Sequence, residues 1–152
     1  MKEIWGSSAM DVFAMGYDPG VPGYGGCIFH YDSSTWSTTK CYLAELAAVW
    51  GSSASDVYAI GQTASYHYDG TAWAVASAVP KGTAIWGSSA TNVFVLDETA
   101  IQRYDGTSGK ATVLPGGCPK LAGIHGASAT EVFAVGEDET VMRYCPGGTC
   151  PP

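Results

Sequence analysis

The sequence predicts an all-β fold built from four copies of one repeated unit. A thirteen-residue stretch, IWGSSAMDVFAMG at 4–16, returns as VWGSSASDVYAIG at 49–61, IWGSSATNVFVLD at 85–97 and IHGASATEVFAVG at 124–136. Charged residues make up only 14% of the chain, against about 25% in ordinary soluble domains. No segment sustains the apolar i, i+3, i+4, i+7 pattern of an amphipathic helix. These observations favour short strands joined by tight turns.

The repeat starts at Ile4, Val49, Ile85 and Ile124, so its intervals are 45, 36 and 39 residues. Intervals of this size are typical of β-propeller blades and other stacked repeats. We therefore expect one domain, a β-propeller of four four-stranded antiparallel blades at approximately 1–45, 46–81, 82–119 and 120–152. One sheet alone cannot bury both of its faces, so neighbouring sheets must cover it.

The second unit illustrates the strands expected in each blade. Its first strand is the apolar stretch Leu46–Trp50, followed by a Gly-Ser-Ser-Ala turn in which serine hydroxyls bond local backbone groups. The second strand is Asp56–Ile60 and the third is Ser65–Tyr68. A hairpin turn at 69–71 leads to an outer strand, Trp73–Ala76.

The turn after the third strand has a form of its own, read as YDSSTW at 31–36, YDGTAW at 68–73 and YDGTSG at 104–109. We expect Asp32, Asp69 and Asp105 to accept hydrogen bonds from turn N–H groups. These turns resemble the Asp-box hairpins of sialidases and several other propellers. The whole unit is similar to β-propeller repeats of large secreted or cell-surface bacterial proteins, including many from myxobacteria. That resemblance covers nearly the whole chain and implies the fold, whereas propeller repeats host many unrelated activities.

The fourth unit departs from the pattern. It has His125 in place of tryptophan, and YCPGGTC at 144–150 replaces the usual turn. The last blade is therefore expected to lack a normal outer strand. Three assemblies follow from this: a small closed ring, half of an eight-bladed ring completed by a second copy, or part of a longer propeller. An exposed edge strand favours pairing with the chain itself or with a larger protein assembly.

The five cysteines favour an oxidising compartment, outside the cell or at its surface, although no signal peptide is present in this sequence. With Ser34 at the centre of the first hairpin, Tyr31 faces Ser37, Phe29 faces Thr39, and Cys27 faces Cys41. Directly opposed residues suit a disulfide; the alternative is two buried free thiols. Cys145 and Cys150 are expected to close a short loop that leaves Cys118 over, unless Cys118 pairs with one of them.

Histidines and tryptophans also recur at fixed positions. His30 and His67 are equivalent, and residues on separate blades lie too far apart for a shared metal site, so we expect them to line their own hairpins. Trp5, Trp50 and Trp86 are expected to pack between blades. The alternative for the tryptophans is a set of aromatic platforms for sugars.

Acidic residues gather in the loops between second and third strands, and the first of these loops, 17–26, is expanded. Such loops share one face of a propeller, where insertions often build a binding site. We expect this face to meet a basic partner, a glycan or Ca²⁺; otherwise it is a set of solvated turns. The candidate residues are Tyr17, Asp18, Tyr24, Asp97, Glu98, Glu137, Asp138 and Glu139.

The net charge of −7 argues against nucleic-acid partners and anionic membranes, and no apolar run approaches the ~20 residues that span a bilayer. Sialidases hold their substrate with three arginines, but this chain has only Arg103 and Arg143. No hydrolase, zinc-protease or phosphate-loop motif is present. We therefore expect a non-catalytic extracellular binding or scaffold module that engages a protein or glycan and needs no cofactor. A structural subunit of a surface assembly or filament comes second, and a glycosidase or lyase third.

Overall fold

The computed structural model describes residues 3–21, 23, 26–42, 45–97, 100–113 and 120–144, which form fifteen strands and, within these ranges, no helix. The strands make four antiparallel sheets, each following chain order from its first strand outward, which confirms the predicted all-β class. The strands are β1 (Glu3–Ser8), β2 (Asp11–Gly16), β3 (Gly26–Tyr31) and β4 (Trp36–Tyr42); β5 (Ala48–Ser53), β6 (Asp56–Ile60), β7 (Ser65–Tyr68) and β8 (Trp73–Val75); β9 (Ala84–Ser89), β10 (Asn92–Leu96), β11 (Ala100–Tyr104) and β12 (Gly109–Val113); and β13 (Leu121–Ser128), β14 (Glu131–Gly136) and β15 (Val141–Tyr144).

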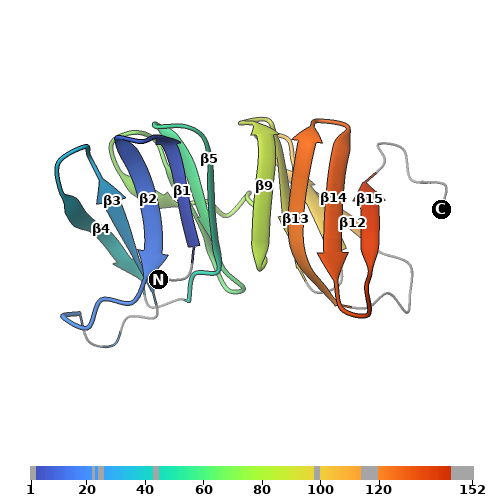
Figure 1. Cartoon of the computed structure of the whole chain (residues 1–152), viewed down its shortest axis with the longest axis horizontal. Helices are drawn as coiled ribbons and strands as arrows, with labels where there is room; N and C mark the ends of the chain where they lie inside the picture. The colour runs from blue at the N-terminus through green and yellow to red at the C-terminus, as the bar shows by residue number, and fades with distance from the viewer. Residues whose placement is uncertain are drawn as a thin grey trace.

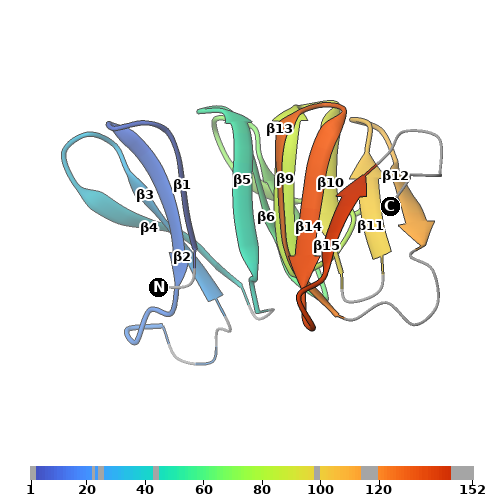
Figure 2. The same cartoon turned by 45° about the vertical axis from the view of Figure 1, so that its right-hand side comes forward.

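The four sheets stand in an open row (Figures 1 and 2). The first strands of successive sheets lie side by side, β1 against β5, β5 against β9 and β9 against β13, while no comparable contact joins β13 to β1 in the described part of the chain. The fourth sheet contains three described strands, and the residues after Tyr144, where an outer strand would follow, lie outside the described part of the chain. The row therefore has two free ends.

The strand limits expected in the second unit are largely confirmed, but the predicted Gly-Ser-Ser-Ala turn is wrong. Strand β5 continues through Gly51 and Ser53, and the turn is at 54–55. The pairing shifts register here, because Gly51 faces Val57 whereas Ser53 faces Asp56. One extra residue on β5 forms a β-bulge, which keeps the chain in the ladder for longer. The Ser53 hydroxyl accepts a hydrogen bond from the Ser55 N–H at 3.3 Å, as predicted for serines in this segment.

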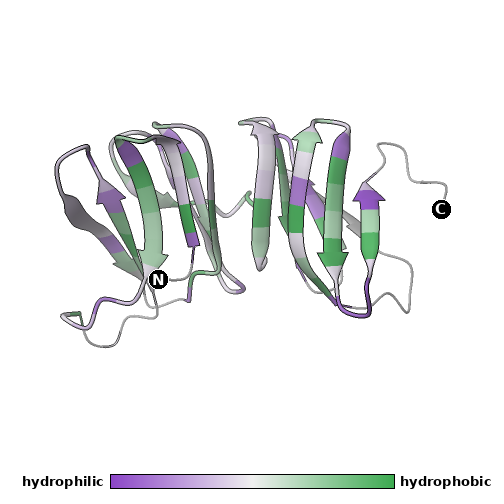
Figure 3. Ribbon diagram, in the orientation of Figure 1, coloured by the Kyte–Doolittle hydropathy of each residue, from purple (hydrophilic) through white to green (hydrophobic). Residues whose placement is uncertain are grey.

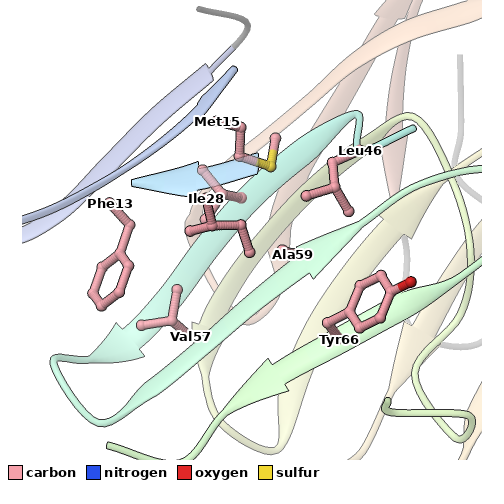
Figure 4. Packing of buried hydrophobic residues seen from close by; sticks show 8 residues of the cluster. Phe13, Met15, Ile28, Leu46, Val57, Ala59 and Tyr66 are labelled. Atoms are coloured by element: carbon pink, nitrogen blue, oxygen red, sulfur yellow. The ribbon is translucent and has the colours of Figure 1, made fainter. Parts of the chain in front are cut away.

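A hydrophobic cluster fills each of the three spaces between neighbouring sheets. We call the side of a sheet that packs on the next sheet its trailing face, and the opposite side its leading face. Between the first two sheets, Phe13, Met15 and Ile28 of the trailing face pack against residues of the second sheet that include Val57 and Ala59 (Figure 4). All five side chains are at most 1% exposed. Packing between sheets, rather than within one, thus supplies the core.

The Trp-Gly pair of the repeat forms a contact between sheets. A Cβ atom placed on Gly51 would lie 2.7 Å from Cη2 of Trp5, and one on Gly87 would lie 2.5 Å from Cη2 of Trp50. Trp86 covers Gly126 in the same way, with 2.7 Å to Cη2. Each tryptophan therefore lies against the glycine of the next unit, which leaves no room for a side chain. This confirms the prediction that the tryptophans pack between units.

The hairpin turns are built as predicted. Oδ1 of Asp69 accepts hydrogen bonds from the N–H groups of Thr71 and Ala72, at 2.8 and 2.9 Å. Equivalent bonds hold the turns at Asp32 and Asp105. These hydrogen bonds lower the pKa of both Asp32 and Asp105 to about 2. The three carboxylates are structural acceptors.

A disulfide joins Cys27 and Cys41, as predicted. The residues pair directly across β3 and β4. The pairing expected nearer the turn was wrong by one residue, since Tyr31 faces Trp36 and Phe29 faces Thr38. A register shift between Ile28 and Phe29 restores the expected alignment before the cysteines are reached. The predicted pair of Cys145 and Cys150, like Cys118, lies outside the described residues.

Candidate functional site

A groove of about 750 Å³ lies between the second and third sheets. This volume is within the range of about 300–1,000 Å³ that is usual for small-ligand sites. The linker from β8 to β9 forms one wall, and residues of the third sheet form the other. The groove is lined by Gln62, Ser77, Ala78, Val79, Pro80, Lys81, Gly82, Thr83, Asp97, Gln102, Thr107, Ser108 and Gly109.

The linker that forms one wall of the groove follows a short outer strand, β8. This outer strand has three residues, whereas β4 has seven and β12 has five. After β8 the chain turns, with the Val79 N–H donating to the Ala76 carbonyl at 3.0 Å. Val79 is then buried in the core between the sheets, and the Ser65 hydroxyl donates to the Pro80 carbonyl at 2.8 Å. The anchored linker thereby forms one wall of the groove.

Asp97 and Gln102 form the polar centre of the groove. The Gln102 side-chain amide donates to Oδ2 of Asp97 at 2.9 Å, and the Ala100 N–H donates to Oδ1 at 2.8 Å. The carbonyl of Lys81 lies 3.5 Å from the same amide nitrogen, while the Lys81 side chain is exposed. One carboxylate, one ammonium group, amides and hydroxyls therefore line the same space. Such a surface suits a ligand recognised by hydrogen bonds.

Both central residues break the repeat. Asp97 replaces the glycine that ends the motif in the other three units, at 16, 61 and 136. Gln102 occupies the position of Phe29, Tyr66 and Met142, as the cross-strand pairing shows. Asp97 was a candidate from the sequence, but Gln102 and Lys81 were missed. An alignment of the four units contains the signal for Gln102, because it is the one polar residue at an otherwise apolar position.

The other acidic candidates do not join Asp97 in one cluster. The β2–β3 and β14–β15 connections lie at the same edge of the molecule but at opposite ends of the row (Figures 1 and 2). Asp18 accepts hydrogen bonds from the Gly20 N–H at 2.9 Å and the Thr38 hydroxyl at 3.2 Å, and Tyr17 is 62% exposed. Tyr24 and Glu98 lie outside the described residues.

Glu137, Asp138 and Glu139 form the tight turn between β14 and β15. The Thr140 N–H donates to the Glu137 carbonyl at 3.1 Å, and Asp138 and Glu139 both have positive φ, 51° and 58°. Positive φ at both central residues is the signature of a type I′ hairpin turn. Among the described residues, no group of three or more His, Cys, Asp or Glu side chains has an arrangement that holds a metal ion.

Serine, aspartate and histidine side chains meet in the first two sheets. In the second sheet, Nε2 of His67 lies 2.7 Å from Oδ1 of Asp56, whose Oδ2 accepts a hydrogen bond from the Ser52 hydroxyl. Ser7, Asp11 and His30 repeat this arrangement. The carboxylate stands between the other two groups, so the imidazole does not contact the hydroxyl. A nucleophilic triad needs the histidine in the middle, and these clusters therefore link strands instead.

The third and fourth sheets use other residues at the same positions. In the third sheet, Nε of Arg103 donates to Asn92 at 2.5 Å, and in the fourth Arg143 lies 3.6 Å from Glu131. His30 and His67 thus belong to a series of cross-strand pairs, one in each sheet, as their predicted structural role requires.

The described part of the chain contains no helix long and apolar enough to cross a membrane. No protein-family model matches the chain, and no curated protein matches it significantly.

Proposed function

We propose that the chain is a non-catalytic binding and scaffold module outside the cytoplasm, and that its sheets are blades of a β-propeller. The observation that carries the binding role is the meeting of two repeat-breaking residues, Asp97 and Gln102, in the groove between the second and third sheets. A repeat that serves packing alone has no need of a glycine-to-aspartate and an aromatic-to-glutamine exchange at one place. These exchanges place a carboxylate and a side-chain amide where the other units have glycine and phenylalanine, tyrosine or methionine.

The ligand class that fits best is a glycan or an extended segment of a protein. Both present rows of hydroxyl, amide and carbonyl groups, which match the Gln102 amide, the Asp97 carboxylate and the hydroxyls of Thr107 and Ser108. The Asp97 carboxylate accepts hydrogen bonds from Gln102 and from a backbone N–H. Held in this way, it is a fixed acceptor, and this supports a binding role over an acid–base role.

The Cys27–Cys41 disulfide supports the proposed extracellular location, since such bonds persist in oxidising compartments. The Asp-centred hairpin turns and the four stacked sheets support the resemblance to secreted propeller repeats.

The binding proposal is tested on an array of defined oligosaccharides, with variants that restore the repeat. Gln102→Tyr and Asp97→Gly introduce the residues of the second unit at these positions, and each is expected to abolish binding while the far-UV circular dichroism is unchanged. Ser37→Ala, at an exposed site on β4, is the control and keeps full binding. Binding that survives both groove variants would show that the groove is not the site.

Turnover is tested separately. Release of new reducing ends from a polysaccharide, lost in Asp97→Asn, would contradict the non-catalytic assignment.

The second candidate function is a structural subunit of a surface assembly. One observation favours it: Val141, at the end of the row of sheets, is 68% exposed although its counterpart Ile28 is buried. A folded chain that binds no array ligand but assembles would support this second function.

A further inference from the structure

Each internal interface joins the trailing face of one sheet to the leading face of the next, and the two ends of the row carry one unused face each. In the first sheet, the trailing positions are Trp5, Phe13, Met15 and Ile28, and the last three are at most 1% exposed. The same positions in the third sheet are Trp86, Phe94, Leu96 and Ile101, and its last three are at most 3% exposed. In the fourth sheet they are His125, Phe133, Val135 and Val141.

The trailing face of the fourth sheet carries three apolar side chains, beside His125 and Arg143, and no other sheet covers it in the described part of the chain. Phe133, Val135 and Val141 are 42%, 49% and 68% exposed. Figure 3 shows bands of hydrophobic residues along β14 and β15 at the end of the row. Contiguous apolar surface of this kind marks an interaction site, and its side chains resemble those that the first and third sheets bury against a neighbour.

No other sheet covers the leading face of the first sheet in the described part of the chain, and this face is exposed in part, although its small Ala14 is buried. Ile4 is 55% exposed, whereas its counterparts Val49 and Ile85 are 3% and 7% exposed. Trp36 is 48% exposed, and it borders an apolar pocket of about 250 Å³ whose lining includes Ala14 and Phe29. This pocket lies where the following sheets receive the trailing side chains of their neighbours.

The exposure of the repeated glycine also indicates that the leading face of the first sheet lacks a neighbour. Gly51, Gly87 and Gly126 are buried, and each lies under a tryptophan of the preceding sheet. Gly6 is exposed, and the atoms nearest to a Cβ placed on it belong to its own sheet, at 3.0 Å or more. Gly6 therefore offers a receiving site that no tryptophan occupies in the single chain.

We propose that these two faces bind each other between two copies of the chain, with the fourth sheet of one copy packed on the first sheet of the other. An internal interface needs one trailing face and one leading face. The fourth sheet offers a trailing face and the first sheet a leading face, so two copies of the chain can form the same kind of interface with each other. The contact is head to tail, and two such contacts close two copies into one ring of eight sheets. At each joint His125 takes the place of the tryptophan opposite Gly6. This inference deepens the self-assembly part of the proposed scaffold role and rests on it.

Native mass spectrometry of the wild-type chain tests the contact, with substitutions at side chains that the single chain already exposes. Ile4→Lys alters the leading face and Val141→Asp the trailing face. Each is expected to raise the dissociation constant of the dimer at least about 100-fold, because a charged side chain would be buried in the contact without an opposite charge beside it. Val75→Lys is the matched control, since Val75 is 71% exposed but lies on β8, away from both ends of the row. This control stays dimeric.

Mixing the two variants identifies the head-to-tail geometry. The unaltered trailing face of the Ile4→Lys chain meets the unaltered leading face of the Val141→Asp chain, so a mixed dimer is expected. A wild-type chain that stays monomeric at about 100 µM would overturn the proposal. So would a dimer that withstands either variant, or variants that do not combine. Glycan binding is measured on the same variants. The groove lies between the second and third sheets, away from both end faces, so loss or retention of glycan binding tests the proposed binding role separately from dimer formation.

Discussion

Replacing Gly87 by alanine tests the contact between tryptophan and glycine that joins the sheets. The new Cβ would lie 2.5 Å from Cη2 of Trp50 and 2.8 Å from Cζ2 of the same ring. Carbon atoms in contact prefer about 3.5–4.0 Å, so the ring must move by about 1 Å. Overpacking of this size costs about 1–3 kcal/mol. Gly87→Ala should therefore lower the free energy of unfolding by about that amount.

Gly6→Ala is the matched control, because the repeat position is the same but no tryptophan lies over it. Its Cβ would lie 3.0 Å from the Asp11 carbonyl oxygen and 3.1 Å from Val12 Cγ2. We expect a change in stability of less than about 1 kcal/mol, since only small local shifts are needed. Equilibrium unfolding in urea, followed by far-UV circular dichroism at one protein concentration, measures both variants.

A double-mutant cycle assigns the cost to the ring. Once Trp50→Ala has removed the indole, Gly87→Ala should cost little more, which gives a coupling energy of about 1–2 kcal/mol. Additive effects of the two substitutions would refute the reasoning. Equal destabilisation by Gly6→Ala and Gly87→Ala would refute it as well, because the backbone rather than the indole would then be responsible.

Three further changes have defined outcomes. Replacing Cys27 and Cys41 by serine should cost about 3 kcal/mol, measured by urea unfolding, because the bond closes a loop of 14 residues; an unchanged midpoint would exclude a stabilising disulfide. Ser33 has a φ of 80°, so Ser33→Gly should raise the melting temperature by relieving up to ~1 kcal/mol of strain. Burial raises the pKa of Glu3, although the Val49 N–H bound to its carboxylate partly opposes this. Its contribution to stability is therefore present below the ordinary pKa of 4.5 and is lost as pH rises. Glu3→Gln should match the wild type at pH 4 and be the more stable at pH 7; the reverse order would contradict this.

The sequence predicted the strands well because each unit repeats its own pattern. Asp56–Ile60 and Ser65–Tyr68 have the predicted limits, since alternating apolar residues and an Asp-Gly turn are local signals. The bulge at Gly51 was not predicted, because a Gly-Ser-Ser stretch reads as a turn unless the partner strand is known. The one-residue shift between Ile28 and Phe29 escaped prediction for the same reason.

The candidate site was predicted only in part. Asp97 stood out as an acidic loop residue, but nothing local to it indicates that Gln102 and the carbonyl of Lys81 approach each other. That proximity depends on the path of the linker that follows β8, which is a property of the folded chain. The acidic loops lie at one edge of the molecule, as expected, but they do not form one cluster, because the β2–β3 and β14–β15 connections are at opposite ends of the row and Asp138 and Glu139 form a tight turn.

The most direct test of stacking by tryptophan on glycine is a nuclear Overhauser spectrum of the isotope-labelled chain. Cross-peaks are expected from the indole of Trp5 to Gly51, of Trp50 to Gly87 and of Trp86 to Gly126, with the glycine Hα resonances shifted by the ring current. Gly6 should show no cross-peak to a tryptophan. Absence of all three contacts in a folded chain would contradict the stacking of each sheet on the next, and a tryptophan contact at Gly6 would contradict the assignment of each tryptophan to the glycine of the following unit.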